Sequence, residues 1–248
     1  MSKSKIIRKI LYGIRAVMGT LLVKEIFMAE KFNSTIVDSE WYKYKSVCPG
    51  GYAVDYAFLY TLYRILTSIK PNNILEFGLG QTSKMIHQYA NYYNVNAVTI
   101  EHDQHWEEFF NEGREGNYNI KTRFFDLENT LYKGCDTSTY KDCCSQFVNE
   151  NEKFDFILLD GGPYLRNPEN NRFYKYARPQ IIDFARFCLK EDFVILLDDY
   201  GIIGIQNTVK EMFNYFDEND IDYIYKEYSG VKRYLVIATP KYRFLTTL

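Results

Sequence analysis

The sequence predicts an α/β protein in which a doubly wound, mostly parallel sheet ends in an antiparallel hairpin and follows an amphipathic N-terminal helix. Three observations support this prediction. Short apolar runs alternate with helical stretches between residues 53 and 198, as a parallel sheet requires. Two later apolar runs are joined by Ser229-Gly230-Val231-Lys232, a short glycine-containing link that is typical of a hairpin. Residues 1–24 carry apolar side chains at helical spacing.

Residues 1–39 are predicted to form a basic amphipathic helical extension. Residues 1–24 contain no acid and six basic residues: Lys3, Lys5, Arg8, Lys9, Arg15 and Lys24. Such a helix can contact an anionic membrane through residues 3–27, or it can pack against the domain or against a second copy in a homodimer. Arg15 interrupts the apolar stretch, and the uncharged run at 16–23 is too short for a membrane span or a signal peptide.

The bulk composition is that of an ordinary globular protein. The 248 residues are 46% hydrophobic and 25% charged, enough for an ample core in one domain, which we place at residues 40–248. The net charge of −2 gives no sign of a nucleic-acid partner. The five cysteines form no CxxC pair, and only three histidines occur. We therefore expect reduced thiols in a cytoplasmic protein, peripheral on the inner face of the membrane if the helix binds lipid.

The elements of the domain follow from apolar runs and spacing. A first helix at 53–69 ends before Pro71. Parallel strands are predicted at 73–77, 97–101, 121–125, 154–160 and 193–198. Helices are predicted at 83–93, 105–112, 173–189 and 206–216, and the hairpin strands at 223–228 and 234–238. Residues 127–153 are polar, and we expect an irregular segment there that serves as a lid or substrate loop.

The segment ILEFGLGQTS, residues 74–83, ends the first predicted strand and begins a helix. Gly78 and Gly80 lack Cβ atoms, so the backbone can turn tightly and a ligand can approach it. Thr82 or Ser83 can cap the following helix, whose N–H groups face that ligand. Glu101 ends the next strand 21 positions beyond Gly80, near the spacing at which a carboxylate accepts ribose hydroxyls. The combination predicts a cofactor loop; the alternative is a structural turn and a chance acid.

This segment resembles motif I of class I S-adenosylmethionine-dependent methyltransferases, in which an acid precedes a Gly-x-Gly loop. The resemblance spans roughly residues 50–240 and implies a Rossmann-like fold with S-adenosylmethionine as cofactor. It implies that Glu76 lies near the methionine amino group, that Glu101 binds the ribose and that Asp126 meets the adenine. Thr82 stands where the common pattern has a third glycine. The residues expected at the cofactor are Glu76, Gly78, Gly80, Gln81, Thr82, Ser83, Glu101, His102, Asp126 and Asp160.

Three aspartates follow neighbouring strands: Asp160 after the fourth, and Asp198 with Asp199 after the fifth. Converging carboxylates repel each other unless a cation, a proton or an arginine intervenes. In one interpretation all three bind Mg²⁺, which activates a substrate hydroxyl, as in the similar catechol-type and macrolide-sugar O-methyltransferases. In another, Asp160 or Asp199 is the catalytic base without a metal. In a third, Asp198 or Asp199 caps the next helix.

The segment after Asp160 indicates the acceptor. Gly161-Gly162-Pro163-Tyr164 has one residue more and one proline fewer than the Asp/Asn-Pro-Pro-Tyr motif of amino-methyltransferases, which favours oxygen as the methylated atom. Basic and aromatic residues follow, and guanidinium groups suit phosphate or carboxylate while tyrosines suit sugar faces. We therefore expect Tyr164, Arg166 and Arg178 to contact the acceptor, although a solvated helix face is the alternative.

The expected function is O-methylation of a small-molecule acceptor, specifically a hydroxyl of a sugar, glycan or glycolipid precursor. Three alternatives stay open at this point. The chain could be a catalytically silent nucleotide- or sugar-binding protein, a membrane-associated assembly factor of envelope glycan synthesis, or an NAD-linked enzyme that uses the same loop. The NAD-linked alternative predicts a sheet that ends in parallel strands, contrary to the C-terminal hairpin.

Overall fold

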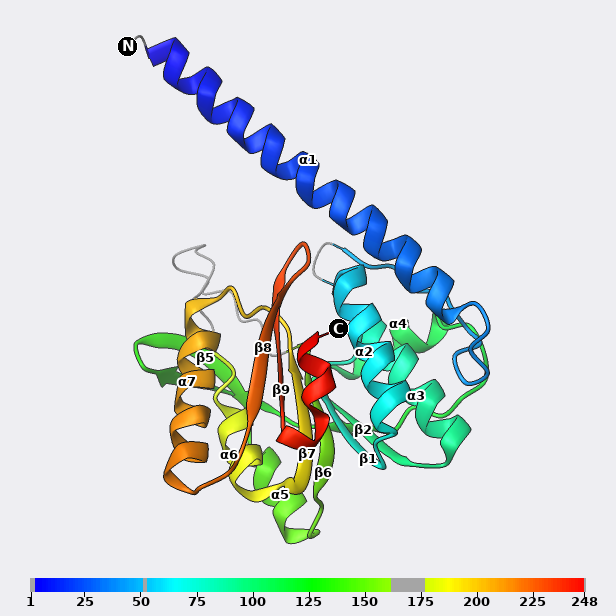
Figure 1. Cartoon of the computed structure of the whole chain (residues 1–248). Helices are drawn as coiled ribbons and strands as arrows, with labels where there is room; N and C mark the ends of the chain where they lie inside the picture. Colours follow the sequence, from blue (N-terminus) through cyan, green and yellow to red (C-terminus); the bar gives the residue numbers. More distant parts are fainter. Residues whose placement is uncertain (1–2, 51–52, 162–176, 248) are drawn as a thin grey trace.

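A seven-stranded sheet forms the centre of the computed structural model, which describes residues 3–50, 53–161 and 177–247 (Figure 1). The strand order is β3-β2-β1-β6-β7-β9-β8. The strands are β1 (Asn73–Phe77), β2 (Asn96–Glu101), β3 (Thr122–Phe124), β6 (Phe154–Leu159), β7 (Leu189–Leu197), β8 (Ile224–Ser229) and β9 (Arg233–Ala238). The first five strands in this order, β3, β2, β1, β6 and β7, pair in parallel, whereas β9 pairs antiparallel with both β7 and β8. The mostly parallel sheet with a C-terminal antiparallel hairpin is thus confirmed.

Helices cover both faces of this sheet, so it is doubly wound. One face carries α2 (Tyr56–Ile69), α3 (Gln81–Tyr93) and the 3-10 helix η1 (Pro240–Thr247). The other carries α5 (Cys143–Asn149), α6 (Gln180–Phe187) and α7 (Ile203–Glu218), while α4 (Gln104–Glu112) joins β2 to β3. Side chains alternate along each strand, so Ile74 of β1 enters the first core and Leu75 the second. This is the Rossmann-like arrangement that the sequence predicts.

The expectation of an irregular segment at 127–153 is wrong. Strands β4 (Leu127–Tyr132) and β5 (Cys135–Tyr140) form a separate two-stranded antiparallel sheet, and α5 follows. Lys133 and Gly134 make the turn with φ of 47° and 75°, the left-handed pair that a tight hairpin needs. The four central residues of β4 are exposed. Polar side chains therefore occupy a strand that apolar patterning cannot detect.

The predicted helix at 173–189 also needs correction. Residues 173–176 lie outside the described ranges, and α6 begins at Gln180, directly after Pro179. Leu189 already belongs to β7, which begins four residues before the predicted strand and ends at Leu197. The early part of β7 is polar and only partly buried, so its apolar run marks only the half that lies in the core.

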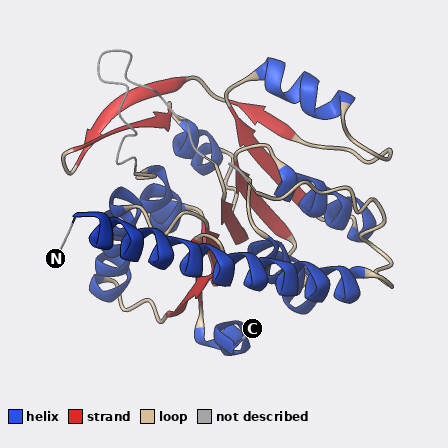
Figure 2. Cartoon of the chain, turned by 90° about the horizontal axis from the view of Figure 1, so that it is seen from above, coloured by secondary structure: helices blue, strands red, loops and turns tan. Residues whose placement is uncertain are grey.

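Helix α1 (Lys3–Ile36) is longer than the basic segment that predicts it and projects well beyond the domain (Figure 1). Its C-terminal end joins the domain core through the buried side chains of Phe32 and Ile36. Further along, the Tyr56 N–H donates to Glu25 Oε1 (2.9 Å), and the Lys24 ammonium donates to the Ser229 carbonyl. Figure 2 shows α1 lying across one end of the molecule. None of the helices within the described ranges has the length and apolar character that crossing a bilayer requires.

The turn between β8 and β9 is tied to the start of α2 by the buried carboxylate of Asp55. Asp55 Oδ1 accepts from the Phe58 N–H (2.9 Å) and so caps α2. Asp55 Oδ2 accepts from the Lys232 N–H (3.0 Å). A Cβ at Gly230 would lie 2.1 Å from that same oxygen, so the turn can approach Asp55 only with glycine at this position.

Candidate functional site

The ends of β1 and β6 meet at two glycines. Gly78 has φ of 91°, and a Cβ there would lie 2.7 Å from Gly161 Cα. A Cβ at Gly161 would in turn lie 2.6 Å from Gly78 Cα. Both positions therefore require glycine, because the two backbones touch where the strand order reverses. In open α/β sheets ligands bind in the crevice at this switch point. Gly80, by contrast, is extended and has open space around the place of a Cβ.

A buried polar chain lies beneath this crossing. Glu76 is wholly buried; its Oε1 accepts from the Thr82 hydroxyl (2.6 Å) and its Oε2 from the Thr99 hydroxyl (2.6 Å). His87 Nε2 lies 2.7 Å from Thr99 Oγ1. Because the Thr99 hydroxyl donates its proton to Glu76, His87 must donate to Thr99 from Nε2. A neutral His87 ring therefore carries its proton on Nε2. Burial lowers the pKa of His87 to about 3, in agreement with a neutral ring.

Thr82 lies between two carboxylates. Its Oγ1 is 2.6 Å from Glu76 Oε1 and 3.2 Å from Asp160 Oδ2. Burial raises the pKa of Glu76 to about 7, against the hydrogen bonds from Thr82 and Thr99. Burial also raises the pKa of the half-buried Asp160 to about 6, with Arg178 opposing the rise and Glu76 adding to it. A single hydroxyl proton can serve one acid at a time, so this pair is most stable with one further proton between the two acids.

Two cations compensate the other aspartates. The buried Arg178 donates from Nη1 to the carbonyl oxygens of Leu159 (3.0 Å) and Asp198 (3.2 Å), the two strand ends, and from Nη2 to Asp199 Oδ2 (3.1 Å). Lys232 Nζ lies 3.5 Å from Asp198 Oδ2 and 3.8 Å from Asp199 Oδ1. Arg178, which we expected at the acceptor, thus organises the two strand ends and Asp199. Asp198 is almost wholly buried, and burial together with Asp160 and Asp199 raises its pKa well above the ordinary value.

The structure supports neither the metal interpretation nor the capping interpretation of the aspartates. Within residues 3–50, 53–161 and 177–247, no three His, Cys, Asp or Glu side chains are arranged to hold a metal ion. The cations next to Asp198 and Asp199 are instead Arg178 and Lys232. Neither Asp198 nor Asp199 caps α7, which begins after Ile202 without a side-chain cap. Asp199 instead adopts a left-handed backbone, with φ of 60°, and faces Arg178.

The glycine loop is held from its other side by β2 and α4. The Leu79 N–H donates to Glu101 Oε2 (3.0 Å), and the Leu79 carbonyl accepts from Trp106 Nε1 (2.7 Å). Glu101 Oε1 accepts from the His102 N–H (2.7 Å) and lies 2.6 Å from His102 Nδ1. Burial acts to raise the pKa of Glu101, but the bonds from His102 and Leu79 outweigh it and hold that pKa below its ordinary value. The same bond to Glu101 raises the pKa of His102.

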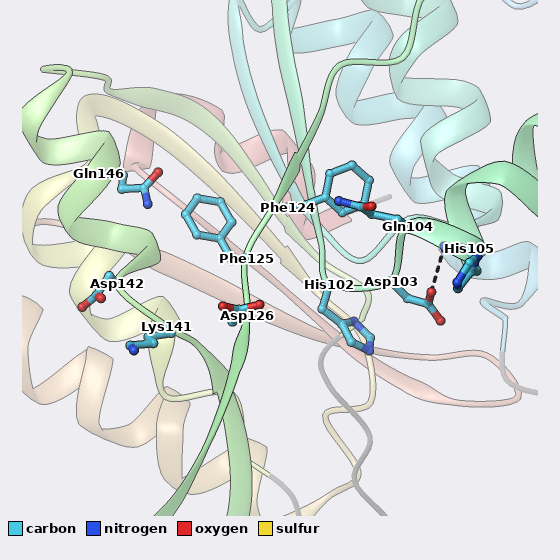
Figure 3. A pocket seen from close by; sticks show the side chains of 10 residues that line it. All are labelled: His102, Asp103, Gln104, His105, Phe124, Phe125, Asp126, Lys141, Asp142 and Gln146. Atoms are coloured by element: carbon cyan, nitrogen blue, oxygen red, sulfur yellow. Dashed lines mark hydrogen bonds between the residues drawn. The ribbon is translucent and has the colours of Figure 1, made fainter.

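A cavity of about 760 Å³ begins at His102, the residue after Glu101. Figure 3 shows its lining, which brings together the ends of β2 and β3 and the start of α5. His102 and Asp126, the residues that we expected near the adenine, are both part of the lining, and Asp126 is exposed. Gln81, also expected at the cofactor, accepts from the Cys48 N–H through Oε1 (3.1 Å). The Ser83 hydroxyl accepts from the Gly80 N–H (2.9 Å) at the start of α3.

Sequence reasoning missed two residues of this site and placed two others where the structure gives no description. Trp106 is 41% exposed beside the loop that it binds. The sequence feature that could have indicated it is a tryptophan shortly after Glu101, the acid that ends the second strand. Lys232 lies in the hairpin link, and no local pattern joins it to the aspartates. Tyr164 and Arg166, expected at the acceptor, lie outside the described residues.

Comparison with known proteins finds similarity in structure and none in sequence. No protein-family model and no curated protein matches the chain. It is similar to the O-methyltransferase from Bacillus cereus in complex with SAH, with 14% identity over 88% of this chain and 90% of that one, at a TM-score of 0.41. It is also similar to a methyltransferase from Pyrococcus furiosus, with 14% identity over 85% of this chain and 95% of that one, at a TM-score of 0.43. A third similar structure is the plantazolicin methyltransferase BpumL in complex with SAH, with 12% identity over 91% of this chain and 98% of that one, at a TM-score of 0.42.

Proposed function

We propose that this protein is an S-adenosylmethionine-dependent methyltransferase that methylates a hydroxyl of a sugar, glycan or glycolipid precursor. The observation that carries the proposal is the glycine loop at the β1–β6 crossing, bound through Leu79 to Glu101, whose chain neighbour His102 lines a cavity at the ends of β2 and β3. The sheet order, with β9 running against its neighbours, agrees with the layout that the motif resemblance implies.

The residues present suit such a cofactor at three points. The loop leads into the start of α3, where the backbone N–H groups of a helix N-terminus carry partial positive charge and favour polar ligand groups. Glu101 keeps a low pKa and therefore stays ionised, ready to accept ribose hydroxyls beside its existing bonds. His102 and Asp126 line the cavity in which an adenine would lie. When bound, S-adenosylmethionine would supply an electrophilic methyl group on a sulfonium.

Asp160 is the residue that we assign as general base. It lies at the end of β6, and its pKa of about 6 leaves it mostly ionised at neutral pH yet basic enough to accept a hydroxyl proton. Asp160 would accept the proton that the acceptor hydroxyl loses on methylation, while the bound cofactor would supply the methyl group and would retain the bonding electron pair on its sulfur. The Thr82 hydroxyl lies within hydrogen-bond distance of both carboxyl groups and so connects protonated Asp160 with Glu76. The added proton is therefore shared between the two acids.

The choice of acceptor rests on the sequence between Tyr164 and Arg178. Its arginines suit phosphate or carboxylate groups and its tyrosines suit sugar faces. The catalytically silent alternative differs in one measurable respect, because it predicts binding of the cofactor without turnover. The NAD-linked alternative predicts binding of NAD in the same cavity.

Calorimetric titration with S-adenosylhomocysteine (SAH) and with NAD tests the cofactor assignment. We expect SAH to bind at micromolar concentration and NAD not to bind. Glu101→Gln should weaken SAH binding about tenfold or more, because a charge-assisted hydrogen bond is lost. Glu112→Gln, an exposed substitution on α4, is the matched control. Absence of SAH binding below millimolar concentration would overturn the proposal.

Methyl transfer from labelled S-adenosylmethionine to a panel of glycan and nucleotide-sugar acceptors tests the chemistry. Asp160→Asn should lower kcat at least about 100-fold, the usual contribution of a general base, while SAH still binds. Asp183→Asn on α6 is the control, since that carboxylate is exposed. Equal turnover of Asp160→Asn and the unmodified protein would remove Asp160 from the mechanism. Turnover that disappears with EDTA would instead restore a metal.

A further inference from the structure

Helix α1 presents two different faces along residues 17–28. Lys24, Glu25 and Met28 face the domain: the first two bind Ser229 and Tyr56, and Met28 packs against the core. The opposite side of the helix is apolar and strongly exposed, with Leu22 at 66% and Phe27 at 62%. We call this opposite side the outward face; at 100° per residue it comprises Leu22, Val23, Ile26 and Phe27.

An apolar face of this size is unusual on a soluble domain. Its four side chains are each more than 60% exposed, and they adjoin one another along nearly two helical turns. Within the described residues these side chains stay exposed, and α1 extends from here beyond the domain towards its N-terminus (Figure 1). Contiguous exposed apolar residues mark a surface that binds a partner or a membrane.

The charge of the helix favours an anionic lipid surface as that partner. Residues 1–24 carry six basic residues and no acid. Two copies of α1 packed side by side would bring these charges together, whereas anionic headgroups attract each of them. Leaving out residues 1–24, the chain has 24 basic and 32 acidic residues, because 30 minus 6 is 24 and all 32 acids lie beyond Lys24. The domain itself is thus acidic and would be held off such a surface.

The placement of the faces allows the helix to lie flat. The outward face is opposite the side that binds Ser229 and Tyr56, so the domain would remain in water while the apolar side chains enter the headgroup region. Helix α1 has 34 residues, a length of about 50 Å. It lies at the end of the domain that holds the β8–β9 turn (Figure 1), whose Lys232 reaches Asp198 and Asp199.

We propose that the outward face of α1 docks the protein on the surface of an anionic lipid bilayer. The apolar residues of that face insert between headgroups, and the basic residues of the helix contact lipid phosphates. The inference does not depend on the methyltransferase proposal, since it uses neither the loop nor the aspartates. If both hold, the site faces an acceptor that is itself anchored in the membrane.

Flotation of the full-length protein with vesicles tests this docking. We expect binding to vesicles with about one third phosphatidylglycerol, little binding to phosphatidylcholine alone, and release as salt rises from about 0.1 M to about 0.5 M. Leu22→Ser with Phe27→Ser should lower the binding constant at least about tenfold, because two inserted side chains are lost. Leu131→Ser with Val148→Ser is the matched control, since both residues are exposed on other elements.

A second pair of variants tests the charge. Arg8→Gln with Arg15→Gln should weaken binding about fivefold per removed charge at low salt. Lys210→Gln with Lys226→Gln, exposed on α7 and β8, should leave it unchanged. Equal binding to neutral and anionic vesicles, or no loss in the Leu22/Phe27 variant, would overturn the proposal. The proposal would also be overturned if the unmodified protein bound no vesicles and sedimented as a dimer, and the Leu22/Phe27 variant sedimented as a monomer. The midpoint of urea unfolding, measured in parallel, confirms that each variant is folded.

Discussion

Replacing Thr82 by valine removes one hydroxyl from between the buried Glu76 and the half-buried Asp160 and keeps the shape of the side chain. At high pH Glu76 is ionised and loses a donor at 2.6 Å, and such a bond to a charged group contributes about 1.5–3 kcal/mol. At low pH Glu76 is protonated and depends less on that donor. We therefore expect Thr82→Val to lower the free energy of unfolding by about 2 kcal/mol at pH 8 and by less than about 1 kcal/mol at pH 5.

The larger loss at high pH follows from the pKa of Glu76. Burial raises this pKa from an ordinary 4.5 to about 7 in the folded state, so the folded protein holds a proton that the unfolded chain releases. The contribution of Glu76 to stability is complete below pH 4.5 and declines as the pH rises towards 7. Above pH 7 the loss amounts to about 3 kcal/mol. Without the Thr82 bond, which lowers this pKa, the decline continues to a higher pH.

Urea unfolding of the two proteins at pH 5 and pH 8 measures the effect. Thr82→Ser keeps the hydroxyl and should recover most of the loss at pH 8. Thr208→Val is the matched control, because Thr208 is buried but donates to the neutral Gly204 carbonyl; its cost, about 1 kcal/mol, should not vary with pH. A pH-independent loss in Thr82→Val, or a serine variant as unstable as the valine one, would refute a proton held between Glu76 and Asp160.

Three further substitutions test how the loop is built. Gly161→Ala should lower stability by at least about 2 kcal/mol, because its Cβ would lie 2.6 Å from Gly78 Cα; an unchanged urea midpoint would show that the strand ends can separate. Gly80→Ala has open space for its Cβ, so it should unfold within about 0.5 kcal/mol of the parent, yet bind SAH at least about tenfold more weakly. Trp106→Phe loses the bond to the Leu79 carbonyl and should weaken SAH binding about fivefold, with stability changed by about 1 kcal/mol or less; unaltered affinity would limit Trp106 to a surface role.

The fold could be predicted from sequence where burial leaves an apolar run. Strands β1, β2 and β6 are buried along almost their entire length, so their residues are apolar and their ends stand out. Strands β4 and β5 lie outside the main sheet, and β4 is largely exposed. Its register depends on the tight turn at Lys133 and Gly134, and the surrounding polar residues gave no periodic signal.

The candidate site could be predicted where its residues follow strands, and not where they come from elsewhere. Glu101 and Asp160 were found because a parallel sheet carries its functional residues at strand ends. Arg178 and Lys232 belong to other segments, and only the folded chain shows that they neutralise Asp198 and Asp199. Without them, three neighbouring aspartates suggest a metal. Gly161 likewise has a meaning that depends on Gly78, a residue far away in sequence.

The three-residue turn between β8 and β9, together with Ser229 before it, connects α1 with two of the aspartates. Lys24 of α1 binds the Ser229 carbonyl, Asp55 holds the Lys232 N–H, and the Lys232 ammonium reaches Asp198 and Asp199. The contacts between α1 and the two aspartates therefore run through Ser229 at the end of β8 and through this turn, and we expect a displacement of α1 to shift the Lys232 ammonium. Linkage of this kind is reciprocal in free energy, so whatever alters the charge around Asp198 and Asp199 also changes how firmly the long helix is held at its base.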